Sequence, residues 1–206
     1  MVFIQFYVEE PSAEAFLRSL LPKILPAHSD FDIQVFQGKS DLLANLPGRL
    51  KALSTWIPDD WRMMVLVDRD DDDCRELKAR LDQAGRQAGL SLRATRPAGE
   101  PIQLLNRIAI EELEAWILGD IPALCQVYPR LSPDLANRER YRDTDAIRGG
   151  TWEALERALQ KVGYHQGGLP KIAVAREVAL HMTPERNRSP SFQVFYRGLK
   201  ELADIP

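Results

Sequence analysis

The chain has 206 residues and a mass of 23.4 kDa, a size that fits one α/β domain or one core with a small appendage. Its composition, 45% hydrophobic and 28% charged, is that of a globular protein and excludes disordered and fibrous classes. The formal net charge of −3 argues against a general nucleic-acid coat protein. Apolar stretches such as residues 63–67 are far shorter than the roughly 18 residues that a membrane span requires.

The N-terminus and the cysteine content indicate a cellular compartment. Residues 1–8 have neither a basic start nor a small-residue cleavage site, so we expect no signal peptide. Two cysteines, Cys74 and Cys125, and three histidines supply neither a disulfide framework nor a zinc site. We therefore expect a reduced, cytoplasmic protein.

The first half of the chain alternates strand patterns with helix patterns. The apolar run at the N-terminus is typical of a strand that is buried on both faces of a parallel sheet. The pattern predicts strands over residues 2–8, 31–37, 62–67 and 90–95 and helices over residues 12–25, 40–57 and 74–88. Pro47 and Gly48 predict an interruption of the second helix. This alternation predicts an α/β fold, a parallel sheet flanked by helices.

The second half of the chain is predominantly helical in pattern. Residues 103–110 are compatible with one more strand, and a helical turn follows over residues 111–118. Residues 129–150 are polar and arginine-rich and are interpreted as a loop or mobile insertion. Helices are predicted over residues 121–128, 151–162, 170–182 and 191–203. We divide the chain into an α/β core over residues 1–120 and a helical, basic region over residues 121–206 that packs on it.

Acidic residues follow two of the predicted strands directly. Glu9 ends the first strand, and Asp68 and Asp70 end the third. Ligands of parallel sheets bind at the carboxyl ends of the strands, so these three side chains are expected to converge. Alternation along an extended chain places Asp68 and Asp70 on the same side. Converging carboxylates repel one another unless a cation neutralises them, and oxygen ligands favour Mg²⁺ or Mn²⁺. A simpler interpretation is that these acids cap the helices that follow.

These segments resemble the Toprim fold, which topoisomerases, primases and the overcoming-lysogenization-defect (OLD) nucleases share. Residues 8–14 (VEEPSAE) resemble the VEGxTE opening of Toprim domains, and residues 66–70 (LVDRD) resemble their hhhDxD strand. Within this group the chain resembles a bacterial family of unassigned activity, the domain of unknown function 4276 family. Residues 108–116 (IAIEELEAW), 169–171 (LPK) and 188–192 (RSPSF) also carry that resemblance. Glu10 stands where the family has a glycine, which leaves Glu9 and Glu10 both open as the ligand.

A second acidic group lies at the predicted helical turn that starts at Glu111. Glu111 and Glu114 are three residues apart and share a helix face, which can simply be a solvated face. The resemblance to OLD-type nucleases implies a further carboxylate that helps to hold a second metal, and Glu112 or Glu114 could serve. A two-metal site would clamp the attacking and leaving oxygens of a phosphodiester.

The segment from residue 157 to residue 200 contains eight lysines and arginines and two glutamates. Such cations can neutralise phosphates, although they can equally form a solvated helix face. The residues that we expect to contact nucleic acid are Lys171, Arg176, Arg186 and Arg188. Lys171 is also expected to offset charge on a scissile phosphate.

The sequence leads to the hypothesis of a Toprim-type nuclease that needs one or two Mg²⁺ or Mn²⁺ ions, with catalytic residues Glu9, Asp68, Asp70 and Lys171. The resemblance implies a role in bacterial anti-phage defence or DNA repair beside an ABC-type ATPase. The chain has no G-x-x-x-x-G-K-[ST] motif, so we expect that ATPase to be a separate subunit. DNA and RNA both remain open as substrates, and a homodimer is a reasonable expectation. The alternatives are a non-catalytic regulatory subunit and, ranked lower, a D-x-D glycosyltransferase, which offers no role for Glu9.

Overall fold

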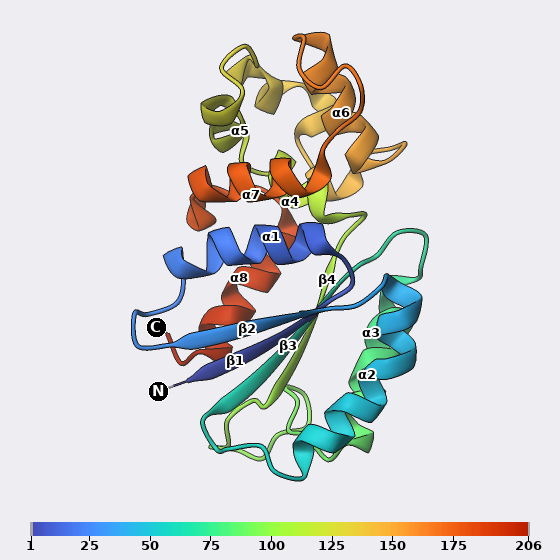
Figure 1. Ribbon diagram of the computed structural model, residues 1–206, viewed down its shortest axis with the longest axis vertical. Helices are drawn as coiled ribbons and strands as arrows, with labels where there is room; N and C mark the ends of the chain where they lie inside the picture. The colour runs from blue at the N-terminus through green and yellow to red at the C-terminus, as the bar shows by residue number, and fades with distance from the viewer. Residues whose placement is uncertain (1, 206) are drawn as a thin grey trace.

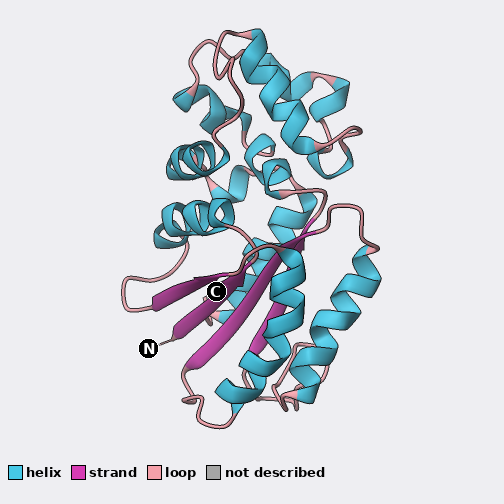
Figure 2. Ribbon diagram, turned by 45° about the vertical axis from the view of Figure 1, so that its right-hand side comes forward, coloured by secondary structure: helices cyan, strands magenta, loops and turns pink. Residues whose placement is uncertain are grey.

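A computed structural model of the protein describes residues 2–205. At its centre lies a four-stranded sheet in which every neighbouring pair of strands is parallel, in the order β2-β1-β3-β4. Helices lie on both faces of this sheet and beyond one of its ends (Figures 1 and 2). The strands are β1 (Phe3–Val8), β2 (Asp30–Val35), β3 (Trp61–Asp68) and β4 (Leu104–Ala109). The helices are α1 (Pro11–Leu20), α2 (Lys39–Ser54), α3 (Cys74–Gln87), α4 (Leu113–Leu118), α5 (Ile121–Val127), α6 (Thr151–Lys161), α7 (Lys171–His181) and α8 (Pro190–Leu202).

The two faces of the sheet bury two separate apolar clusters, which explains the nearly continuous apolar strands. Successive side chains of a strand point to opposite faces, so both faces of the central strands must be apolar. In β3, for example, Met64 and Leu66 join the cluster on the side of α1 and α8, whereas Met63 and Val65 join the cluster on the side of α2 and α3. The predicted α/β fold with a parallel sheet is confirmed.

The fourth strand differs from the one predicted. Residues 90–95 contribute only an isolated bridge between Leu92 and Leu104, because the chain turns immediately afterwards and the amide groups of Thr95 and Arg96 both bond to the carbonyl of Leu92. The strand that pairs with β3 on the side opposite β1 is β4, and all six residues of β4 are buried. The strand that the sequence allowed over residues 103–110 therefore joins the sheet, as β4 (Leu104–Ala109).

Helix α2 runs from Lys39 to Ser54 without the interruption that was predicted at Pro47. Its buried residues Leu42, Leu46 and Leu50 recur every four positions, so a continuous helix can place all three against the sheet. Packing of this stripe outweighs the low helix propensity of proline and glycine.

The helical region beyond residue 120 shares its core with the sheet. One buried cluster extends from strand residues such as Phe6 to Phe192 and Phe195 of α8. Residues 129–150, which were expected to form a loop, fold into three short 3₁₀ helices: η2 (Pro133–Asn137), η3 (Glu139–Tyr141) and η4 (Thr144–Ala146). Side chains of Ser132 and Asp143 cap two of them. Among residues 2–205, no helix combines the length and apolar character needed to cross a bilayer.

Candidate carboxylate site

Glu9 follows β1 and is buried at the carboxyl edge of the sheet. The residue is only 7% exposed, and its Oε1 atom accepts a hydrogen bond of 2.6 Å from the backbone N–H of Asp68, at the end of the neighbouring strand. Burial raises the pKa of Glu9 to about 7, although this hydrogen bond and the nearby Lys39 lower it. The predicted meeting of Glu9 with the end of β3 is therefore present.

Asp68 is the last residue of β3 and lies among other acids. Its pKa is raised well above the ordinary value, first by loss of water around the carboxyl group and then by Glu9, Glu114 and other nearby carboxylates. Such a group is unfavourable in a folded protein unless it binds a proton or a cation. Glu9, Asp68, Asp70 and Glu114 are called the carboxylate site below.

Asp70 departs from the expected strand alternation. The strand ends at Asp68, and Asp70 has a left-handed backbone with φ of 48°. Glu111, on the segment after β4, is also left-handed, with φ of 64°, and its carbonyl accepts the N–H of Asp70 at 2.9 Å. Non-glycine residues seldom adopt this conformation, and it is concentrated at functional sites. The turn directs the Asp70 carboxylate to Lys39, whose Nζ lies 2.6 Å from Oδ2.

Glu111, Glu112 and Glu114 have three different environments. Glu111 forms an ion pair with Arg69. Glu112 Oε2 accepts hydrogen bonds from Thr151 Oγ1 at 2.9 Å and from the N–H of Trp152 at 2.8 Å. It therefore binds a backbone N–H group at the start of α6 that has no partner within the helix. Glu114 is 2% exposed, and its Oε2 atom has no hydrogen-bond partner. Among these three acids, Glu114 is therefore the one with a buried carboxylate oxygen that has no partner.

Two lysines lie beside the carboxylate site. Lys171, at the start of α7, has its Nζ 3.7 Å from Glu114 Oε1 and 4.9 Å from the centre of the Trp152 ring. Burial opposes its charge, but Glu114 and other nearby acids more than compensate and raise the pKa of Lys171. Lys39 was missed in the sequence. It follows the carboxyl end of β2, the same edge of the sheet that directed attention to Glu9 and Asp68.

The chemistry of these residues suits a divalent cation. All are oxygen donors, Glu114 has a buried unpartnered oxygen, and the pKa values of Glu9, Asp68 and Glu114 are raised first by burial and then by neighbouring carboxylates. Within residues 2–205, however, no three acidic, histidine or cysteine side chains are already gathered as a ready-made ligand set. Asp70 is paired with Lys39, which also pairs with Asp72.

The model of one protein family, DUF4276 (domain of unknown function), matches residues 8–200 of the chain. The chain belongs to this family. The DUF4276 match extends from the last residue of β1 into α8 and so contains the whole carboxylate site together with Lys39 and Lys171. Neither the search of curated proteins nor the search of solved structures gave a significant match.

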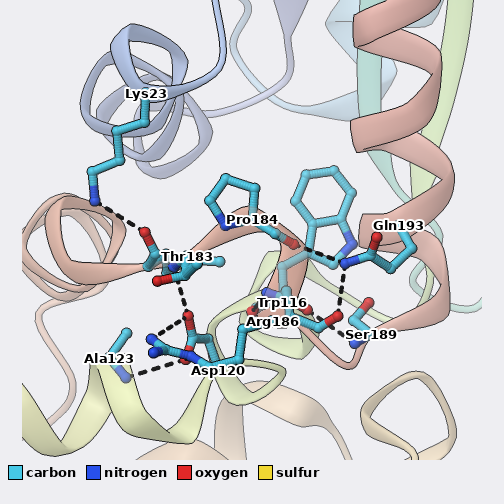
Figure 3. A network of polar contacts seen from close by, with 11 residues as sticks. Lys23, Trp116, Asp120, Ala123, Thr183, Pro184, Arg186, Ser189 and Gln193 are labelled. Atoms are coloured by element: carbon cyan, nitrogen blue, oxygen red, sulfur yellow. Dashed lines mark hydrogen bonds and ion pairs between the residues drawn. The ribbon is translucent and has the colours of Figure 1, made fainter. Parts of the chain in front are cut away.

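Arg186, which was predicted to bind nucleic acid, is engaged within the fold of this DUF4276 protein. Arg186 donates from Nε and Nη2 to the fully buried Asp120 at 2.8 and 3.0 Å. Asp120 also accepts the N–H groups of Ala123 and Thr183, which links the start of α5 to the end of α7 (Figure 3). This arrangement gives Arg186 a structural role, because its guanidinium neutralises a buried carboxylate.

Arg188 and Arg176 have different surroundings. Arg188 donates to the carbonyls of Ala136 and Arg142 and thereby fastens the η2–η4 segment to the start of α8. Arg176 is exposed on α7 and lines a surface hollow with residues of α1. Arg186 and Arg188 are therefore engaged within the fold, whereas Lys171 lies at the carboxylate site.

Proposed function

We propose that this DUF4276 protein is a Toprim-type nuclease that hydrolyses phosphodiester bonds with Mg²⁺ or Mn²⁺. The observation that carries the proposal is that burial raises the pKa values of Glu9, Asp68 and Glu114, that the charges of Glu9 and Glu114 raise the pKa of Asp68 further, and that one oxygen of Glu114 has no partner. Such a site is stabilised when a cation binds. The ends of two parallel strands supply Glu9 and Asp68, as the resemblance to Toprim domains implies.

In this proposal each residue has a definite task. Glu9, Asp68 and Glu114 would hold the cation, and Asp70 would join them if its pairing with Lys39 were released. A bound Mg²⁺ or Mn²⁺ would polarise a phosphodiester oxygen as a Lewis acid. Lys171 is held beside Glu114 in its charged form and can offset negative charge on the phosphate. Glu112 positions α6 and does not need to touch substrate.

The proposal extends to the setting of the reaction. We infer that the protein acts in the bacterial cytoplasm, in phage defence or DNA repair, with a separate ABC-type ATPase and as a homodimer. The chain itself has no P-loop motif. Copurification with the products of neighbouring genes tests the partnership, and light scattering tests the dimer.

Metal binding and cleavage test the core of the proposal. Asp68→Asn and Glu114→Gln keep the size of the side chains and remove their charge, whereas Asp59→Asn removes an exposed charge just before β3, at the opposite end of that strand from Asp68. Calorimetry should show Mn²⁺ binding by the wild type and by Asp59→Asn, and at least tenfold weaker binding by the other two variants. Labelled DNA and RNA should be cut with Mg²⁺ or Mn²⁺ and not with EDTA. Cleavage that persists in EDTA or in Asp68→Asn would refute the proposal.

A second candidate function is a non-catalytic binding or regulatory subunit. The observation that favours it is the Lys39 ammonium, which already neutralises Asp70 at 2.6 Å and thereby lowers the need for a cation. Glu10, in place of the glycine of the Toprim opening, adds a further charge near Glu9 and Asp68. Metal binding without cleavage of any nucleic acid, alone or with a partner ATPase, would favour this second function.

A further inference from the structure

A strongly basic cleft lies between the η2–η3 segment and α6, at the end of the molecule that is uppermost in Figure 1. Its volume is about 360 Å³. The floor is apolar and includes Leu131, Leu135 and Ala158, all buried. The rim carries five cations and no acid: Arg130, Arg138, Arg140, Arg157 and Lys161. These five residues and their floor are called the arginine cleft.

The cations of the arginine cleft are not neutralised within the protein. All five are exposed, and none belongs to an ion pair among residues 2–205. Acids are present in the same segments but do not line the cleft. Glu156, for example, accepts the N–H of Leu169 at 3.0 Å, and Glu139 lines an adjoining hollow, to which Arg140 also contributes.

Several of these cations are held in place by the backbone. Arg130 donates to the carbonyl of Gly163 at 3.1 Å, and its guanidinium lies 4.0 Å from the centre of the Tyr164 ring. Arg157 and Lys161 are one helical turn apart on α6, so they project from the same face. Arg140 donates to the carbonyl of Arg148 at 3.0 Å. A rim prepared in this way loses less side-chain entropy when it binds an anion.

We propose that the arginine cleft binds the phosphate backbone of a nucleic acid. This inference rests on the proposed nuclease function, because it assigns a surface that binds the substrate at a distance from the bond that is cleaved. A single small anion would engage one or two of the cations, whereas a polymer of phosphates engages cations on both walls. An acidic protein is the less suitable occupant, because the rim offers charge without the large exposed apolar side chains of a protein interface.

Helix α6 connects the arginine cleft to the carboxylate site. Its first residues are bound by Glu112, and Trp152 lies under Lys171. Lys161 is nine residues beyond Trp152, which corresponds to about 14 Å along the helix axis. The helix therefore fixes the distance between the two sites. A nucleic acid in the arginine cleft would reach the carboxylate site a few nucleotides away.

Binding in EDTA separates this inference from catalysis. We would measure fluorescence anisotropy of labelled single-stranded DNA, duplex DNA and RNA over a series of salt concentrations. The variant Arg157→Gln/Lys161→Gln removes two cations of the cleft. Its matched control, Lys51→Gln/Arg80→Gln, removes two exposed cations from α2 and α3 and leaves the same net charge. Far-UV circular dichroism would verify that both variants are folded.

The expected result is a loss confined to the cleft variant. At about 0.1 M salt its affinity should fall by on the order of tenfold or more, and the slope of log affinity against log salt should decrease by about 1.4 to 1.8, the contribution of two phosphate contacts. The control should match the wild type. An unchanged slope in the cleft variant, stronger binding of polyglutamate than of any oligonucleotide, or no oligonucleotide binding by the wild type would overturn the inference. Because Mn²⁺ binding at the carboxylate site is measured separately, failure of the cleft and failure of the nuclease proposal are distinguishable.

Discussion

Replacement of Glu114 by glutamine should stabilise the metal-free protein at neutral and alkaline pH. Glu114 is 2% exposed, and burial raises its pKa from 4.5 to about 7, although Lys171 lowers it while Glu112 and Glu10 raise it further. Glutamine has nearly the same shape and no charge to bury. The substitution therefore removes the cost of ionising a carboxyl group in this position.

The magnitude follows from the difference in pKa between the folded and the unfolded chain. Between pH 4.5 and pH 7 the folded protein holds the Glu114 proton more tightly than the unfolded chain does, so the free energy of unfolding decreases as the pH rises through this range. A shift of this size in the pKa of Glu114 lowers the free energy of unfolding at pH 8 by about 3 kcal/mol. Below pH 4.5 both states are protonated and the contribution vanishes. We expect the free energy of unfolding of Glu114→Gln to exceed that of the wild type by up to this amount at pH 8. Near pH 4 the two free energies should be equal.

Urea unfolding followed by circular dichroism, at several pH values in EDTA, measures this difference directly. Glu9 and Asp68 titrate in both proteins, so the quantity of interest is the difference between wild type and variant at each pH. Addition of Mn²⁺ should stabilise the wild type and have little effect on Glu114→Gln. Parallel stability curves for the two proteins, or a variant that is less stable at pH 8, would refute the burial argument for Glu114.

Three further predictions concern other positions. Asp120→Ala should reduce the free energy of unfolding by about 2 to 3 kcal/mol, because it leaves the buried N–H of Ala123 and the partly buried donors of Thr183 and Arg186 unpaired; a loss below about 0.5 kcal/mol in urea unfolding would contradict this. Gly198→Ala should cost about 1 to 3 kcal/mol, because a Cβ there would lie 2.3 Å from Nη2 of the buried Arg107; an unchanged melting temperature would show that Arg107 moves freely. Lys39→Gln should move the pKa of Glu9 further upward, since Lys39 lowers it; a downward shift in a carboxyl NMR titration would be inconsistent with that contact.

Much of the sheet was predictable from sequence, because β1 and β3 are buried on both faces and their residues are almost all apolar. The position of β4 was not. Residues 90–95 have strand-like composition, and only the tertiary structure shows that β4 forms the ladder with β3. The helical spacing of the second acidic group could not identify Glu114 either. Its burial depends on the orientation of α4 against α7 and on Lys171.

The charges of the basic region show the same limit. Arg186 and Arg188 are residues of the type that contacts phosphates. In the fold they bind Asp120 and the carbonyls of the η2–η4 segment instead, and these partners are distant in sequence. The arginine-rich segment over residues 129–150 has no helical periodicity, and its cations meet those of α6 only after the chain folds back. Lys39 could have been noticed, since it follows a strand at the same edge as Glu9.

The shared apolar cluster has a consequence for synthesis on the ribosome. The face of β4 that α8 covers, and Trp116 with its aromatic neighbours Phe192 and Phe195, are completed only when the last helix has emerged. At roughly 5 to 20 residues per second, the interval between β4 and the end of α8 is on the order of 5 to 20 s. During this interval the nascent chain exposes the apolar surface of β4 that α8 later covers, and exposed apolar surface of this kind favours aggregation. A fragment that stops at residue 120 would remain in that state permanently.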